Sequence, residues 1–324
     1  MNRKLATGLA VSAVLLALLL LRVDAAEVTA AFAAARPGWL ALTLALHLGV
    51  LSLKAVRWGV VLDAVPHGPR PRWLTFDALF LGYFGNYVLP AKLGELGRSA
   101  LYSDRSGLPL TATLATILFE RLVDAAVLVA AFYVVVLSGA LPFALPAWME
   151  TSARTAGLAA LAGLLGLAWV ARRGPLQGRL ATLQRHVEAA LSGLAPLRDA
   201  RVIGITVAWT ALIWSVEAAS IGTVLRAFGH PLPAAGAVVQ MVISSFAIAA
   251  PSAPGGLGIH QWVTVLVLDP WGVPAADATA ASLVMTFAVV LWVVPLGLAG
   301  LWRQGSSLGA LQRAVDAQRN PERG

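Results

Sequence analysis

Three charged residues lie close together inside a long apolar stretch of this sequence. Glu120, Arg121 and Asp124 begin about ten residues into the stretch Leu110–Leu137, at a depth of about 15 Å if that stretch is a membrane-spanning helix. On a helix, Glu120 and Asp124 share a face and Arg121 lies beside them. Each charge costs about 2.5 to 3.5 kcal/mol near the middle of a bilayer, so these side chains must face protein or water.

A second set of charges precedes this stretch. Lys92, Glu95 and Arg98 recur every three residues and therefore share one side of a helix. Together the two sets predict a charged, partly hydrated cavity. Lys92, Arg98 and Arg121 are suited to a phosphate group, and the carboxylates would order these cations or bind a positive headgroup. The alternative is a closed network of salt bridges that only fixes helix packing.

Three further polar residues are candidates for a role. Glu217 stands halfway along an apolar stretch, where it could couple protons or bind a cation, or be an inert hydrogen-bonded acid. His260 and Gln261 begin a helix just after a glycine-rich segment, where a lone histidine is more often a packed residue than a ligand. No second histidine or carboxylate stands at metal spacing, so neither a metal nor another cofactor is expected.

The composition places these residues in a membrane protein. Of 324 residues, 58% are apolar and 12% are charged, which is too little charge to cover a soluble globular protein. The absence of cysteine excludes disulfides, thiolate zinc sites and cysteine nucleophiles. The net charge of +8 reflects membrane topology rather than nucleic-acid binding.

Six stretches are long and apolar enough to cross a hydrocarbon core of about 30 Å. They are Leu5–Leu21, Trp39–Leu62, Leu110–Leu137, Ala153–Ala171, Val202–Leu225 and Ala278–Trp302. The predicted fold class is therefore an all-α polytopic membrane protein with six transmembrane helices and two re-entrant helical hairpins. The first stretch also resembles a secretory signal, although it is long for one.

The two hairpins come from shorter apolar stretches. Trp73–Leu89 runs into Pro90 and then into the charged segment, which is too polar to cross lipid. Ala235–Ala250 and Gly255–Leu268 are each too short to span and meet at a pair of prolines.

The distribution of basic residues supports this topology, because lysine and arginine collect on the cytoplasmic side. Of the 24 basic residues, four fall outside and one lies within a span, which leaves 19 in the cytoplasm. The four outside are Arg22, Arg36, Arg154 and Arg226. A full crossing by the first hairpin would turn the arginine-rich segment 172–201 outward. That segment is predicted to be an amphipathic helix along the inner leaflet, and residues 303–324 a cytoplasmic tail.

The same topology predicts an inverted repeat. Residues 39–138 and 202–302 each contain a span, a hairpin and a span in opposite orientations, an arrangement that places a site near the bilayer midplane. Both hairpin tips carry the pattern P-x-x-x-G-x-L-G, formed by Pro90, Gly94 and Gly97 and by Pro251, Gly255 and Gly258.

At each tip the exposed N–H groups of a new helix would attract an anion, and the two tips would meet from opposite sides. The alternative is that the glycines merely permit tight packing. The residues assigned to the tips and to gating are Pro90, Gly94, Gly97, Pro251, Pro254, Gly255, Gly256, Gly258, His260 and Gln261.

The chain lacks an H-E-x-x-H helix, a G-x-S-x-G elbow and a P-loop, so no enzyme class is indicated. Three segments instead carry a family resemblance. GYFGNYVLPAKLGELGR from Gly82 to Arg98, ERLVD from Glu120 to Asp124 and PGGLG from Pro254 to Gly258 resemble the lysylphosphatidylglycerol synthase transmembrane domain family. The resemblance covers most of the chain, from Trp39 to about Trp302.

The resemblance implies movement of lipids, notably aminoacylated phosphatidylglycerol, between leaflets, and it adds Asn86 of the first segment to the substrate-binding residues. Some family members carry a soluble aminoacyl transferase domain, for which we expect no room in a chain that ends at Gly324. The family often has charged residues after the glycine segment, where this chain has His260 and Gln261, so the cargo and the charge at the outer gate stay open.

The sequence therefore predicts a non-enzymatic lipid translocase of the bacterial inner membrane with both termini in the cytoplasm. Its partner would be an anionic or aminoacylated phospholipid and not nucleic acid, with a homo-oligomer or a separate lipid-modifying enzyme left open. The residues predicted to bind the substrate are Asn86, Lys92, Glu95, Arg98, Glu120, Arg121, Asp124 and Glu217. Alternatives are an intramembrane enzyme, a transporter of polyprenyl-phosphate lipids in envelope biogenesis and a scaffold for a partner enzyme.

Overall fold

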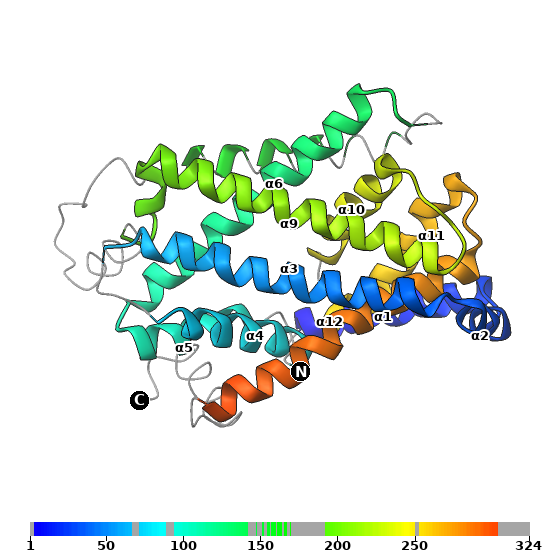
Figure 1. Cartoon of the computed structure of the whole chain (residues 1–324), viewed down its shortest axis with the longest axis horizontal. Helices are drawn as coiled ribbons and strands as arrows, with labels where there is room; N and C mark the ends of the chain where they lie inside the picture. Colours follow the sequence, from blue (N-terminus) through cyan, green and yellow to red (C-terminus); the bar gives the residue numbers. More distant parts are fainter. Residues whose placement is uncertain are drawn as a thin grey trace.

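The computed structural model describes residues 3–66, 71–88, 94–141, 192–249 and 253–303, together with short runs between 147 and 169. Every regular element in these ranges is a helix, which confirms the all-α class for this part of the chain (Figure 1). The helices are α1 (Arg3–Arg22), α2 (Ala25–Ala34), α3 (Pro37–Asp63), α4 (Arg72–Val88), α5 (Gly94–Ser106), α6 (Leu110–Leu137), α9 (Ala200–Ala227), α10 (Ala234–Ala249), α11 (Ile259–Leu268) and α12 (Ala275–Arg303), with the 3-10 turns η2 (Ala195–Arg198), η3 (Pro254–Gly256) and η4 (Asp269–Trp271).

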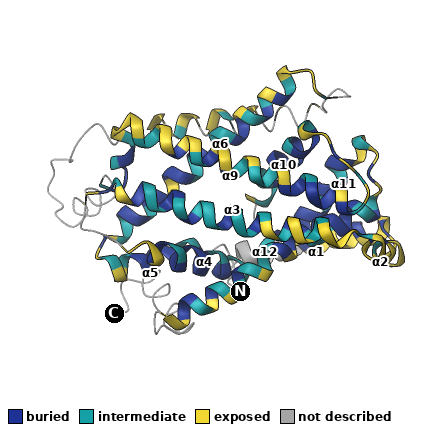
Figure 2. Cartoon of the chain, in the orientation of Figure 1, coloured by how far each residue is buried: buried dark blue, intermediate teal, exposed yellow. Residues whose placement is uncertain are grey.

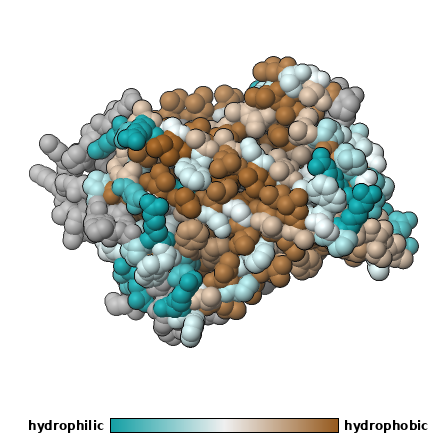
Figure 3. All heavy atoms as spheres, in the orientation of Figure 1, coloured by the Kyte–Doolittle hydropathy of each residue, from teal (hydrophilic) through white to brown (hydrophobic). Residues whose placement is uncertain are grey.

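Three of these helices, α3, α9 and α12, are both apolar and long enough to cross a membrane. They contain 27, 28 and 29 residues, so each is about 40 Å long. Their outward faces carry exposed apolar side chains such as Leu212, Phe287 and Leu291 (Figure 2). Figure 3 shows an apolar band across the middle of one face, with hydrophilic residues toward its two ends. This surface is that of a protein embedded in lipid.

Helices α3 and α9 lie side by side and run antiparallel along the centre of the molecule (Figure 1). Proline at the first helical position starts α3, and the side chain of Asp199 caps α9 by accepting a hydrogen bond from the N–H of Arg201 at 2.8 Å. Thr43 lies opposite Thr223, with 2.9 Å between their hydroxyl oxygens, and Arg57 lies opposite Thr210. We refer to the two ends of this pair as the Pro37 end and the Asp63 end.

Two pairs of shorter helices pack against the long ones. Helix α4 packs against α5 toward the Asp63 end, and α10 packs against α11 toward the Pro37 end (Figure 1). The bounds of α4, α10 and α11 agree with the predicted stretches to within a few residues. Helices α5 and α11 contain 13 and 10 residues, so their lengths of about 20 and 15 Å are well short of the hydrocarbon thickness.

Helix α1 packs against α11, beside the connection between α10 and α11. The hydroxyl of Ser12 accepts a hydrogen bond from the backbone N–H of Ala253 at 2.8 Å, although this serine is surrounded by apolar residues in the sequence. The side chain of Ser12 is buried, and Gly258 packs against its backbone. This helix therefore supports the α10–α11 pair, a contact that the sequence analysis did not predict.

The structure differs from the sequence prediction in two places. The last residues of the amphipathic helix expected over residues 172–201 do not belong to one continuous helix, because Pro196 lies in the 3-10 turn η2 and Asp199 is the N-cap of α9. Residues 172–191 and 304–324 lie outside the described ranges. Helix α2 was not predicted.

The contact between α4 and α5 gives a first prediction. A Cβ on Gly94 would overlap the backbone carbonyl oxygen of Gly82, which cannot move aside. We therefore expect Gly94→Ala to lower the free energy of unfolding by about 1–3 kcal/mol, the usual effect of overpacking. Thermal unfolding in detergent, followed by tryptophan fluorescence, measures the change.

Gly49→Ala provides a matched control, because a Cβ at this position in α3 would have no neighbour within 4 Å. Since alanine favours helix by about 1 kcal/mol over glycine, this control should unfold at the same or a higher temperature. Equal melting temperatures for Gly94→Ala and the unmodified chain would contradict the packing described for α4 and α5.

Candidate functional site

Arg57 on α3 is the centre of a buried charged cluster. Its side chain is 1% exposed, and its Nε donates a hydrogen bond to Glu120 Oε1 at 3.0 Å. Its Nη1 and Nη2 donate to the two carboxylate oxygens of Asp124 at 2.5 and 3.2 Å, and Nη1 also donates to the hydroxyl of Thr210 at 2.8 Å. A single guanidinium group thus joins α3 to both α6 and α9.

A second arginine completes the buried part of the cluster. Arg98 on α5 donates through Nη2 to the other carboxylate oxygen of Glu120, at 3.4 Å. Its guanidinium carbon lies 4.6 Å from the ring centroid of Trp58, in a cation–π contact, and the side chain is 3% exposed. Glu120 therefore bridges two arginines from two other helices.

The outer part of the cluster is accessible. Arg121 and Glu95 are each 40% exposed, and Arg121 Nε lies 3.5 Å from Glu95 Oε1. Arg121 Nη1 lies 3.6 Å from Asp124 Oδ2, so this arginine connects the exposed pair to the buried carboxylates. Glu95, Arg98, Glu120, Arg121 and Asp124, which the sequence predicted to meet, do meet here.

Lys54 adds a cation that the sequence analysis did not assign to the site. Its ammonium nitrogen lies 5.1 Å from the ring centroid of Trp214 and 5.7 Å from that of Tyr83. Trp214 in turn donates its indole N–H to Asp124 Oδ1 at 3.2 Å. Tyr83 also interacts electrostatically with Arg98 and Arg121, so the phenol lies among three cations.

The described cluster contains more positive than negative charge. It holds four cations and three carboxylates, so its formal charge is +1: Lys54, Arg57, Arg98, Arg121, Glu95, Glu120 and Asp124. Glu120 and Asp124 are occupied by the two buried arginines, Arg57 and Arg98. The remaining positive charge is carried by Lys54 and by the accessible Arg121, which is an arrangement that favours an anion.

Arg57 is a central residue that sequence reasoning did not assign to the site. In the sequence analysis it is one of the 19 basic residues assigned to the cytoplasmic side. The available signal was the spacing of polar residues on α3, because Thr43, His47, Lys54 and Arg57 fall on one face of a helix.

The segment between the two predicted sets of charges is described only in part. Lys92 and Pro90 lie outside the described residues. Asn86, near the end of α4, accepts a hydrogen bond from the N–H of Gly94 through its side-chain oxygen at 3.1 Å. Asn86 therefore joins α4 to the start of α5, in which Gly94 and Gly97 are buried.

The glycine segment Pro254–Gly258 contacts α4. Gly255, Gly256 and Gly258 have φ angles of 70°, 73° and 86°, a left-handed backbone that other residues rarely adopt. The ring of Tyr87 lies directly against Gly255, and α4 contacts η3. The two helix pairs thus touch close to their connections, while Pro251 lies outside the described residues.

The side chains that follow the glycine segment form hydrogen bonds within the protein. The side-chain oxygen of Gln261 accepts a hydrogen bond from the N–H of Gly258 at 2.8 Å, and its amide donates to the hydroxyl of Thr286 at 3.2 Å. His260 Nδ1 also lies 3.2 Å from that hydroxyl, and both side chains are buried. These contacts attach the start of α11 to α12.

Comparison with known proteins places this geometry in a family. The family model described as the lysylphosphatidylglycerol synthase TM region matches residues 5–297. The chain belongs to this family. The match includes α1 and every helix that contributes to the charged cluster.

Two curated relatives differ in how much of their own length this chain covers. Glycosyltransferase AglD of Haloferax volcanii is 25% identical over 90% of this chain, which spans about half (53%) of that protein's length. A UPF0104 membrane protein of Methanothermobacter thermautotrophicus is 21% identical over 95% of this chain and 98% of its own length. This membrane region therefore occurs both within a longer protein and as nearly the whole of another.

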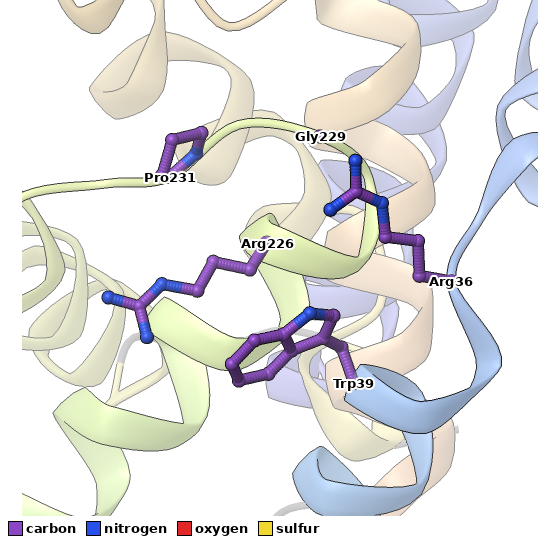
Figure 4. Close-up of a pocket in the computed structure, with 5 residues that line it drawn as sticks. All are labelled: Arg36, Trp39, Arg226, Gly229 and Pro231. Atoms are coloured by element: carbon purple, nitrogen blue, oxygen red, sulfur yellow. The ribbon is translucent and has the colours of Figure 1, made fainter.

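A separate pocket lies at the Pro37 end of the α3–α9 pair. Its volume is about 320 Å³, and it is lined by Arg36, Trp39, Arg226, Gly229 and Pro231 (Figure 4). The guanidinium group of Arg226 lies over the ring of Trp39, whereas Arg36 extends to a different side of the pocket. Because the two guanidinium groups do not converge, they do not form a single anion site in this conformation.

The buried cluster gives a second prediction. Replacing Arg57 by alanine leaves Glu120 and Asp124 without their main partner in a buried environment, and breaking such a pair costs about 3–5 kcal/mol. We expect Arg57→Ala to lower the melting temperature in detergent strongly or to abolish stable expression. Size-exclusion chromatography and thermal unfolding measure this effect.

The control is Arg105→Ala, since Arg105 forms an exposed ion pair with Asp104 at 3.6 Å. Exposed pairs contribute at most about 1 kcal/mol, so this variant should behave like the unmodified chain. Similar stabilities for Arg57→Ala and Arg105→Ala would refute the central role of Arg57.

Proposed function

We propose that this chain is a lipid translocase that moves an anionic or aminoacylated phospholipid between the leaflets of the cytoplasmic membrane. The proposal includes six spans, two oppositely oriented re-entrant pairs (α4–α5 and α10–α11) and cytoplasmic termini. Membership of the lysylphosphatidylglycerol synthase TM family supports a membrane function related to lipids. The short lengths of α5 and α11 and the contact between Tyr87 and Gly255 support the re-entrant arrangement.

The observation that carries the proposal is the partly open charged cluster within an apolar bundle. A closed salt-bridge network would bury all its members, yet Arg121 and Glu95 remain 40% exposed beside buried partners. Placing these two charged side chains against lipid tails would cost free energy, so we assign the pair to a hydrated entrance. The entrance lies toward the Asp63 end of α3, which is the cytoplasmic end in the proposed topology.

In the proposed mechanism, the phosphate of the lipid headgroup binds to Lys54 and Arg121. The buried Arg57 and Arg98 do not need to contact the lipid, because they hold Glu120 and Asp124 and so fix the position of the site. Glu95 would pair with a cationic headgroup, such as an aminoacyl group, when the phosphate displaces it from Arg121. Rocking of one helix pair against the other at Tyr87 and Gly255 would then open the opposite side.

A second candidate is group transfer to a lipid. One relative is named a glycosyltransferase, although this chain matches only about half of that protein. The described residues of the cluster show no nucleophile paired with a base, so we propose that the chain is not itself an enzyme. The two functions differ in their product, because an enzyme changes the mass of its lipid and a translocase changes only its leaflet.

The test is reconstitution of the purified protein in vesicles that contain fluorescent phosphatidylglycerol, lysyl-phosphatidylglycerol or phosphatidylcholine. The chain should accelerate loss of the inner-leaflet signal to an external quencher for one of the two phosphatidylglycerol lipids and not for phosphatidylcholine. Lys54→Gln and Arg121→Gln should each slow the transfer at least tenfold, about the effect of losing one charged hydrogen bond.

Arg105→Gln is the matched control, because it removes an exposed guanidinium group from the same region of the chain. Mass spectrometry of the recovered lipids distinguishes transfer from chemistry. Rates that are equal for the Lys54, Arg121 and Arg105 variants would remove the assigned binding roles, and a lipid of altered mass would favour the enzyme.

A further inference from the structure

A second polar site lies on the same pair of long helices, nearer the Pro37 end. His47 on α3 is 3% exposed, and its Nε2 lies 3.8 Å from Glu217 Oε1 on α9. On the other side of the ring, Nδ1 lies 2.7 Å from the hydroxyl of Ser220 and 3.1 Å from the backbone carbonyl oxygen of Thr43. The imidazole is thus fixed between the two helices.

The contacts of His47 are compatible with either neutral tautomer. Nδ1 donates to the carbonyl oxygen of Thr43 in one tautomer and accepts a hydrogen bond from the hydroxyl of Ser220 in the other. In both tautomers Nε2 faces the carboxylate of Glu217 at 3.8 Å. A protonated ring carries a proton on each nitrogen, so it can donate to α3 or α9 on one side and to Glu217 on the other.

In the part of the chain that the structure describes, few other ionisable groups lie near this pair. His260 on α11 and Tyr87 on α4 interact electrostatically with Glu217, and His260 also interacts with His47. Helix α10 carries no ionisable residue, and α12 carries its ionisable residues only near its ends, at Asp277 and Arg303.

The remaining neighbour, α6, carries its charges in the cluster around Arg57, which lies about 15 Å further along α3 than His47. Lys54 lies between the two sites, about two helical turns from His47. In the middle of the described bundle, Glu217 is therefore the acidic group that faces His47.

We propose that His47 and Glu217 form a proton-binding site that couples proton movement to the lipid transfer proposed above. Without a proton the pair carries a charge of −1, and with one proton it is neutral overall, either as imidazolium and carboxylate or as imidazole and carboxylic acid. Because an uncompensated charge in an apolar bundle is costly, the pair takes up a proton from whichever side gives it access to water.

The position of the pair links protonation to helix movement. His47 and Ser220 join α3 to α9, and the adjacent Thr43 and Thr223 join the same helices one turn further on. Tyr87, which interacts with Glu217, also packs against Gly255. A change in charge at the pair therefore acts both on the α3–α9 interface and on the contact between the two helix pairs.

The proposal rests on the proposed function, so the experiment measures lipid transfer and proton binding separately. In vesicles with a gradient of one pH unit, coupling of one proton to one lipid favours accumulation on one side by about tenfold. The gradient should produce this bias in the unmodified chain, and Glu217→Gln and His47→Gln should reduce the ratio to one. Vesicles with equal pH on both sides show whether lipid transfer occurs at all.

Glu27→Gln and His230→Gln are the matched controls. They make the same chemical changes at the exposed Glu27 of α2 and at His230, which pairs with Asp277 at the Pro37 end. Both controls should keep the tenfold bias. Transfer in the unmodified chain that does not respond to the gradient overturns the coupling and leaves the proposed function intact.

Proton binding is measured directly by potentiometric titration of the purified protein in detergent. The titration curve of the unmodified chain should contain one extra proton-binding step that both Glu217→Gln and His47→Gln remove, because the two side chains share that proton, and that Glu27→Gln leaves in place. Ser220→Ala should change the pH at which this proton is taken up but should not remove the step, since Ser220 only orients the ring. If lipid transfer is absent but the extra proton is present, the proposed function fails and the proton site stands. Equal proton uptake by the unmodified chain and Glu217→Gln overturns the site.

Discussion

The guanidinium group of Arg57 fixes the position of three long helices, since it donates hydrogen bonds to α6 through Glu120 and Asp124 and to α9 through Thr210. Inside an apolar bundle these charges cannot be left unpaired, because desolvation of a single ion costs several kcal/mol. The geometry of one arginine therefore sets how α3, α6 and α9 face one another. Arg98 extends the same constraint to α5 through its contact with Glu120.

This constraint explains why only part of the charged cluster is available to a ligand. Glu120 and Asp124 are almost completely buried and are held by arginines, so they belong to the framework. The excess positive charge remains at Lys54, which lies over two aromatic rings, and at the accessible Arg121. The buried ion pairs thus hold Lys54 and Arg121 in position. The positive charge of these two residues exceeds the negative charge that nearby carboxylates supply.

The interface between α3 and α9 shows how polar residues can serve two purposes in an apolar bundle. Hydroxyl groups of Thr43, Thr223 and Thr210 hydrogen-bond across the helices, and small polar contacts of this kind support helix association in lipid. On the same interface, the imidazole of His47 faces the carboxylate of Glu217 at 3.8 Å. One helix pair thus contains a paired charged cluster, hydroxyl contacts and an ionisable site at successive depths.

The sequence by itself determined the helical class, the membrane-embedded surface and the bounds of α4, α10 and α11, because length and apolar composition are local properties of a segment. It also identified the family and brought Glu95, Arg98, Glu120, Arg121 and Asp124 together as a group, because charges are costly inside apolar stretches wherever they occur. Where the described residues overlap the helix expected over residues 172–201, Pro196 lies in a 3-10 turn, which is an equally local effect.

Only the tertiary structure decided which charges are partners. From the sequence, Arg57 and Lys54 are only two of the basic residues on the cytoplasmic side, and His47 has no assigned role. Their roles depend on α3 lying antiparallel to α9 and against α6, a contact between segments more than 60 residues apart in the chain. The spacing of polar residues along α3 marked one face of a helix, but a single helix face does not specify its partner, and the pairing energy exists only once the helices pack.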